Sequence, residues 1–142
     1  MNPSSTGPGT APSPHQERIR QLIQEISIIS GFENVRFIIL YGSASTGSEL
    51  PDSDIDLCIY YDGDSTIASR FRHAILSLPA AERFDIQLFS QLPLYIRKEV
   101  LKGLVVFAPD IRFVYETANR TIHEYNDFRH RLDDYTGVAA IS

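Results

Sequence analysis

The fold of this chain is decided by two neighbouring segments, Leu40-Tyr41-Gly42-Ser43 and Pro51-Asp52-Ser53-Asp54-Ile55-Asp56-Leu57. The first segment closes an apolar run that begins at Val35 and ends in a glycine–serine turn. The second segment opens another apolar run with two carboxylates at positions i and i+2. Short apolar runs rich in β-branched and aromatic residues are typical of buried strands. The pattern therefore predicts two strands. The first ends in a glycine–serine turn, and the second begins with two aspartates.

Three aspartates are placed to meet on one face of the predicted sheet. Side chains alternate faces along a strand, so Asp54 and Asp56 point one way while Ile55 and Leu57 enter the core. Asp85 lies in a third apolar run with the same alternation, and it joins the other two acids if its strand lies beside theirs. Clustered carboxylates repel one another, and Mg²⁺ prefers oxygen ligands. The three acids therefore predict a divalent metal site.

The turn before the spacer is suited to a phosphate group. Gly42 allows the backbone to approach a ligand closely. Ser43 offers a backbone N–H and a hydroxyl, and a helical turn beginning there would add free N–H groups. Phosphoryl transfer depends mainly on positioning and on charge neutralisation. The glycine–serine turn and the three aspartates together predict a site that binds a nucleoside triphosphate by means of a divalent metal ion.

This combination of motifs resembles the nucleotidyltransferase superfamily that includes DNA polymerase β. The likeness is greater to the minimal nucleotidyltransferases of bacteria and archaea, and it extends over residues 16–135. It rests on residues 40–47, on residues 52–57 and on the third acid, Asp85. The segment 102–107 and the tyrosine- and arginine-rich tail are also similar to that subfamily.

The resemblance implies transfer of a nucleoside monophosphate from a triphosphate, with release of pyrophosphate. ATP is the implied substrate, with two Mg²⁺ ions as cofactors. The implied catalytic residues and metal ligands are Asp54, Asp56 and Asp85, and Asp85 would also help to deprotonate the acceptor hydroxyl. The implied nucleotide-binding residues are Gly42, Ser43 and Ser53.

Minimal members often act as antitoxins that attach AMP to a tyrosine of a HEPN-domain ribonuclease toxin, which is therefore the implied partner. Many relatives have an arginine after the Gly-Ser pair, whereas this chain has Ala44-Ser45-Thr46. The negative charge of the phosphates is therefore expected to be neutralised by metal, by backbone groups or by residues elsewhere in the chain. Two alternatives remain. One is nucleotidyl transfer to a small molecule such as an aminoglycoside, and the other is neutralisation of a partner by binding alone.

The composition of the chain limits the number of domains, the classes of partner and the cellular location that can be expected. The chain has 142 residues, 43% of them hydrophobic, which suits one domain with a real core. Its net charge of −5 argues against tight DNA or RNA binding, which depends on neutralising phosphates. A single cysteine, Cys58, excludes an intramolecular disulfide and is expected to be a small buried residue. No membrane span or signal sequence is visible, so a cytoplasmic location is expected.

The sequence predicts a disordered tail, residues 1–14, followed by a nucleotidyltransferase domain, residues 15–142. The expected fold is α+β, a polymerase β-like small mixed sheet of about four strands with helices on one face and the acids on the other. Strands are expected at residues 35–41, 54–61, 84–89 and 104–107. Helices are expected at residues 16–30, 65–78, 93–102 and 110–135. The apolar stripe of the last helix either packs on the domain or docks a partner.

Overall fold

The computed structural model describes residues 14–42 and 54–132. Its helices are α1 (Pro14–Ile26), α3 (Ser65–Leu76), α4 (Leu94–Val100) and α5 (Ile111–Leu132). Its strands are β1 (Val35–Tyr41), β2 (Ile55–Tyr61), β3 (Phe84–Leu88) and β4 (Leu104–Phe107). Three short 3₁₀ helices link them: η2 (Phe32–Asn34), η3 (Pro79–Ala81) and η4 (Phe89–Gln91). The expected tail lies outside the described residues except for Pro14, which begins α1.

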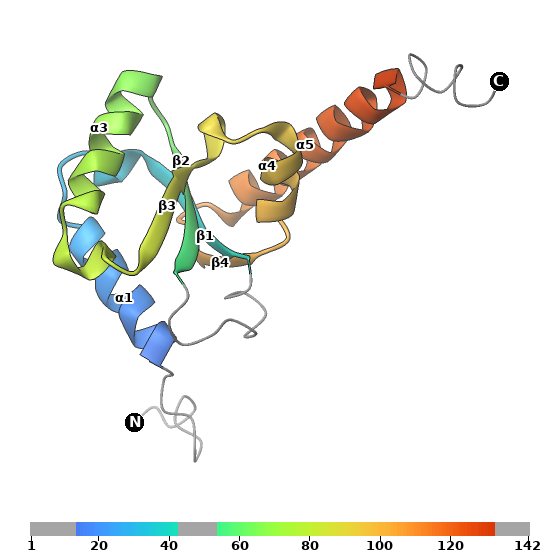
Figure 1. Ribbon diagram of the computed structural model, residues 1–142. Helices are drawn as coiled ribbons and strands as arrows, with labels where there is room; N and C mark the ends of the chain where they lie inside the picture. Colours follow the sequence, from blue (N-terminus) through green and yellow to red (C-terminus); the bar gives the residue numbers. More distant parts are fainter. Residues whose placement is uncertain (1–13, 43–53, 133–142) are drawn as a thin grey trace.

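The four strands form one mixed sheet in the order β3-β2-β1-β4 (Figure 1). Strand β1 is antiparallel to both of its neighbours, β2 and β4. Strand β2 is parallel to β3, and α3 provides the crossover that a parallel pair requires. The α+β fold with a four-stranded mixed sheet is therefore confirmed.

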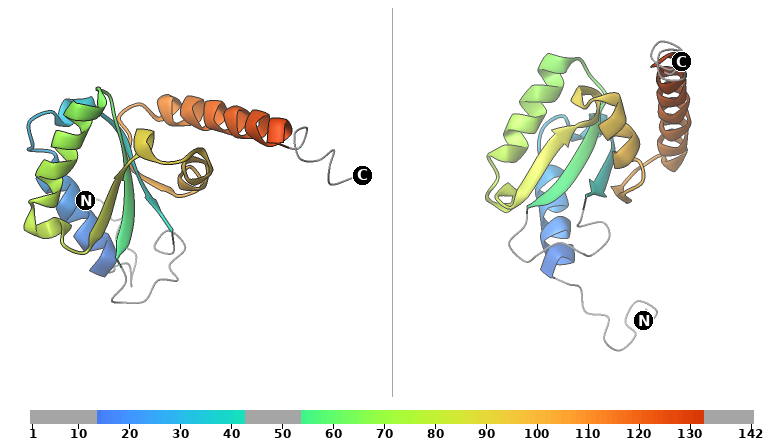
Figure 2. Two further views of the ribbon diagram at one scale, coloured as in Figure 1. Left: turned by 45° about the horizontal axis from the view of Figure 1, so that its top comes forward. Right: turned by 45° about the vertical axis from the view of Figure 1, so that its right-hand side comes forward.

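Helices cover both faces of the sheet, with α1 and α3 on one side and α4 and the start of α5 on the other (Figures 1 and 2). The first face packs Ile38, Leu57 and the other residues of its core against α1 and α3. The second face has its own apolar cluster, which includes Phe37, Ile39 and Cys58. This corrects the expectation that all helices lie on one face. The physical reason is that β1 is apolar on both faces, so both faces need cover.

The first helix is shorter than its apolar spacing predicts. It ends at Ile26, where Ser27 begins a turn and its hydroxyl donates to the carbonyl oxygen of Gln24 at 2.6 Å. Such local serine bonds compete with the helix ladder. Gly31 lies beyond the turn that follows α1; its φ of 97° is left-handed, and it is the N-cap residue of η2.

The apolar stripe of α5 divides into two parts. Val114, Thr117 and Thr121 are buried, and Lys98 on α4 lies 4.9 Å from the ring of Tyr125. Farther along, α5 extends away from the sheet (Figure 2), and Phe128 is 47% exposed. The first part therefore packs on the domain, while the second leaves apolar surface open. No helix within residues 14–42 and 54–132 has the length and apolar character needed to cross a membrane.

We expect Gly103→Ala to destabilise the fold. Gly103 follows α4 and lies against β1, and a Cβ there would overlap the carbonyl oxygen of Leu40 and lie 2.9 Å from Cγ2 of Ile39. Both atoms belong to β1, an interior strand of the sheet, so the loss of stability should be that of overpacking, about 1–3 kcal/mol. Urea denaturation measures it. The control is Gly63→Ala, whose Cβ would meet nothing nearer than 3.4 Å. Equal stability of the two variants would contradict the prediction.

Candidate active site

The sheet brings Asp56 and Asp85 together on its second face. Strands β2 and β3 pair in parallel, with Asp56 opposite Asp85. On the other side of β2, Asp56 pairs with Tyr41 at the end of β1. Neighbouring strands lie about 4.8 Å apart, so the two carboxylates are close enough to interact directly. The predicted adjacency of the two acid-bearing strands is confirmed.

Alternation places the remaining acid on the same face. Ile55 and Leu57 are fully buried in the first core, as expected, so Asp56 points to the second face. Asp54 immediately precedes β2 and is exposed. It lies two residues before Asp56, so in an extended chain the two side chains share a face, and its charge raises the pKa of Asp56.

The acids of the cluster affect one another's ionisation. Burial raises the pKa of Asp56, and the charges of Asp85 and Asp54 and a hydrogen bond with Asp85 raise it further. Burial also raises the pKa of Tyr41 to about 12, with further contributions from Cys58, Asp56 and Asp85. Each of these shifts disfavours another negative charge at this end of the sheet. A cation bound here would reduce this repulsion.

Gly42 is required by two features of the turn that follows β1. Its φ of 75° is left-handed, a conformation that side chains disfavour. A Cβ on this residue would lie 2.6 Å from Oδ2 of Asp56. The glycine thus leaves free the position next to Oδ2 of Asp56 that a larger residue's Cβ would occupy.

The donor set fits Mg²⁺ as an incomplete site. Within residues 14–42 and 54–132, no group of three or more His, Cys, Asp or Glu side chains is arranged to hold a metal ion. Mg²⁺ is usually bound by one or two carboxylates, with phosphate and water oxygens as its other ligands. Asp56 and Asp85, opposite one another on β2 and β3, could supply such a pair, and the lack of a Cβ on Gly42 avoids an overlap with Oδ2 of Asp56. The assignments of Asp54, Asp56 and Asp85 as metal ligands stay predictions.

Two expected nucleotide-binding residues, Ser43 and Ser53, lie outside the described residues, as does the segment Ala44-Ser45-Thr46. The structure therefore places Gly42 against the acid cluster and tests neither serine. It also adds two residues to the site, Tyr41 and Gln87. Gln87 shares a face with Asp85, and its Nε2 donates to Oδ1 of Asp85 at 2.8 Å. The alternation of side chains along residues 84–88 was the signal for Gln87.

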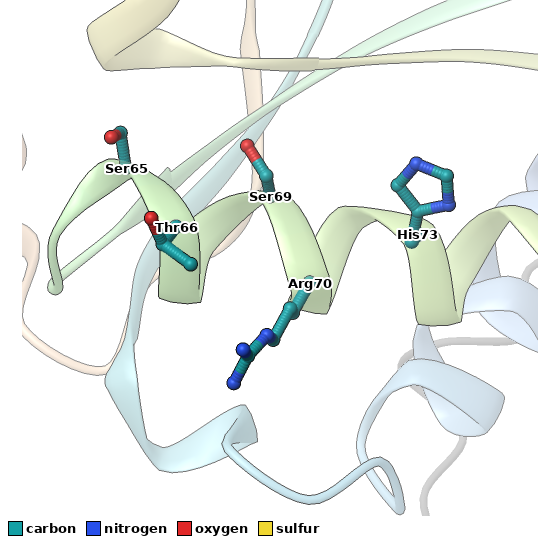
Figure 3. A pocket seen from close by; sticks show the side chains of 5 residues that line it. All are labelled: Ser65, Thr66, Ser69, Arg70 and His73. Atoms are coloured by element: carbon teal, nitrogen blue, oxygen red, sulfur yellow. The ribbon is translucent and has the colours of Figure 1, made fainter.

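A shallow hollow of about 450 Å³ lies on α3 and is separate from the acid cluster. Figure 3 shows Ser69 and His73 on one side of the helix and Arg70 on the other. Helix α3 packs on the first face of the sheet, whereas the acids lie on the second. The hollow therefore contributes no residue to the candidate active site.

The sequence of this chain is similar to that of known nucleotidyltransferases. Residues 23–112 match the model of the family described as polymerase beta, nucleotidyltransferase. A protein of Methanocaldococcus jannaschii, named provisionally as protein adenylyltransferase MJ1547, is 33% identical over 75 residues. That match covers 52% of this chain and only 57% of the relative.

Solved structures share the fold at low sequence identity. A chain from a toxin–antitoxin crystal structure with AMP-PNP aligns with a TM-score of 0.63 and 16% identity, covering 89% of this chain and 98% of that one. A chain from a complex of a tri-AMPylated Shewanella oneidensis HEPN toxin with its MNT antitoxin aligns with a TM-score of 0.58 and 15% identity. That alignment covers 89% of this chain and 95% of the other. The family match spans most of this chain, from α1 to the start of α5, and includes the strands that bear Asp56 and Asp85. The chain therefore belongs to the polymerase β-type nucleotidyltransferase family.

Proposed function

We propose that this chain transfers AMP from ATP to a tyrosine hydroxyl of a partner HEPN ribonuclease toxin, and so acts as an antitoxin. The observation that supports this most directly is the pairing of Asp56 with Asp85 beside Gly42. The name of the Methanocaldococcus jannaschii relative and the AMPylated toxin of the Shewanella oneidensis complex support the choice of AMP and of acceptor.

Each residue of the site has a role in the proposal. Asp54, Asp56 and Asp85 hold Mg²⁺, and Gly42, Ser43 and Ser53 hold the triphosphate. When bound, Mg²⁺ neutralises charge on the triphosphate. The raised pKa of Asp56, caused by burial and then by its acidic neighbours, supports a cation at this place.

The proposed reaction is an in-line displacement at phosphorus. The acceptor oxygen forms a bond to the α-phosphorus of ATP, while the bond from that phosphorus to the bridging oxygen of the β-phosphate breaks. Pyrophosphate leaves, and the hydroxyl proton passes to the carboxylate of Asp85. Asp85 is suited to this role because it is exposed on β3, at the edge of the sheet, where an external acceptor can reach it.

Exposed aromatic side chains on α4 and α5 support the proposal that the acceptor is a protein. Tyr95 on α4 is 56% exposed, and Tyr115 and Phe128 on α5 are 63% and 47% exposed. Exposed aromatic side chains of this kind are enriched at protein interfaces. They provide apolar area for a partner on the side of the sheet that also bears the acids.

Intact mass spectrometry of the partner tests the proposal. A candidate HEPN-domain toxin would be incubated with the chain, ATP and Mg²⁺. We expect one or more AMP-sized increments, mapped to tyrosine, and none with the Asp54→Asn/Asp56→Asn variant. A stable complex without an increment would indicate neutralisation by binding alone. An increment found only on hydroxylated small molecules, such as an aminoglycoside, would also overturn the proposal.

A further inference from the structure

The carboxylate of Asp85 is held by a neighbour on its own strand. Gln87 Nε2 donates to Asp85 Oδ1 at 2.8 Å, and both side chains lie on the acid-bearing face of β3. We propose that Gln87 is a positioning residue that fixes the Asp85 carboxylate for the transfer reaction. This inference rests on the proposed function, in which Asp85 takes part in cation binding and accepts the proton.

Asp85 needs such a restraint. Its side chain is exposed and lies on β3, which has a neighbouring strand on one side only. The closest strand partner is Asp56, whose charge has the same sign. Repulsion between the two carboxylates and the freedom of an exposed side chain both favour rotation of Asp85 away from the site. A directed hydrogen bond opposes that rotation.

An amide suits this position better than a charged group. A carboxylate only accepts hydrogen bonds, so the amide nitrogen of Gln87 must face Asp85. The amide is neutral and therefore restrains Asp85 without replacing the cation that the acids attract. Lysine or arginine here would neutralise the cluster, and glutamate would add a further negative charge. The printed contact of Gln87 is with Oδ1 alone, so the amide restrains one oxygen of the Asp85 carboxylate.

The backbone beneath Gln87 is itself fixed. Arg72 on α3 donates from Nε to the carbonyl oxygen of Ile86 at 2.7 Å. That carbonyl belongs to the peptide group that links Ile86 to Gln87. On the other side, Gln87 pairs with buried Cys58 of β2. Gln87 is half-buried and extends from a strand whose backbone is held on both sides, whereas Asp85 is exposed.

The test compares Gln87→Met with the unaltered chain. Methionine has nearly the same length and no donor, so it removes the hydrogen bond and retains the volume. At saturating Mg²⁺ we expect kcat for AMP transfer to fall about 10–100-fold, as for other residues that orient a metal ligand, with KM for ATP unchanged. We also expect weaker binding of Mn²⁺ to the nucleotide-free protein, measured by electron paramagnetic resonance.

A matched control is Gln91→Met, which removes another amide hydrogen bond, the 3.2 Å contact with Ser69 Oγ. This variant should match the unaltered chain in kcat and in Mn²⁺ affinity. If Gln87→Met fails to fold, Gln87→Asn gives the same test, because its amide is too short to hold Asp85. Unchanged kcat and Mn²⁺ affinity in a folded Gln87 variant would overturn the inference. If the unaltered chain binds Mn²⁺ but modifies no toxin, the proposed function fails, while the Mn²⁺ comparison still tests Gln87.

Discussion

Asp56→Asn is expected to abolish AMP transfer and, at the same time, to make the metal-free protein more stable. Asparagine keeps the shape of the side chain but removes a charge that the cation and the triphosphate require. Loss of one preorganised electrostatic group usually costs about 10²–10³ in rate. The same charge is unfavourable in the folded protein, because burial and then Asp85 and Asp54 raise the pKa of Asp56. Removing it should therefore stabilise the fold modestly, because solvent screens a partly exposed charge.

The pH dependence of this gain has a definite sign. A carboxyl whose pKa is raised by folding destabilises the folded state once it ionises. Below its ordinary pKa of 3.8 the carboxyl is protonated in both states, so Asp56 and asparagine should be equivalent. As the pH rises above that value, the variant should become progressively more stable than the unaltered chain. Thermal melting in EDTA across acid and neutral pH measures the difference.

The control for both effects is Asp127→Asn, which removes an exposed carboxylate from α5, far along the chain from the sheet. It should change neither transfer nor the pH dependence of stability. Transfer retained by Asp56→Asn would show that Asp56 is not part of the catalytic site. A variant less stable than the unaltered chain at neutral pH would show that Asp56 is not repelled by its neighbours.

The acid cluster was predictable from the sequence because it depends on alternation. Asp54 and Asp56 share a face in any extended strand, and the apolar neighbours of Asp56 identify the buried side. To predict that Asp85 lies next to Asp56, one must also know that β2 pairs in parallel with β3. That pairing is set by the crossover through α3, which the sequence places between the two strands but does not orient.

Other features depend on tertiary contacts that the sequence pattern does not contain. The continuous apolar run from Val35 to Tyr41 indicates a strand buried on both faces, yet it does not say which helices cover each face. The second apolar cluster, around Phe37 and Phe89, is formed with α4 and α5 only after the chain turns back over the sheet. The hydrogen bond from Gln87 to Asp85 likewise depends on rotamers that alternation alone leaves open.

Gly42→Ala is expected to inactivate the chain although it adds one methyl group. The φ of Gly42 is 75°, and holding an alanine there costs about 1 kcal/mol or more. The added Cβ would also lie 2.6 Å from Oδ2 of Asp56, so the turn or the carboxylate must move. Either movement closes the space in which the proposed site brings cation and triphosphate together. We expect AMP transfer to fall at least about 10²-fold.

The decisive comparison is between Gly42→Ala and Gly31→Ala. Gly31 also has a left-handed φ, 97°, but its Cβ would approach the hydroxyl of Tyr61 rather than an acid of the site. Gly31→Ala should therefore lower the free energy of unfolding and leave kcat of the folded fraction unchanged. Gly42→Ala should lower both, because its methyl group meets the carboxylate that the site uses. Transfer assays scaled to the folded fraction, alongside urea denaturation, separate the two outcomes. Full activity per folded molecule in Gly42→Ala would remove the turn after β1 from the catalytic site.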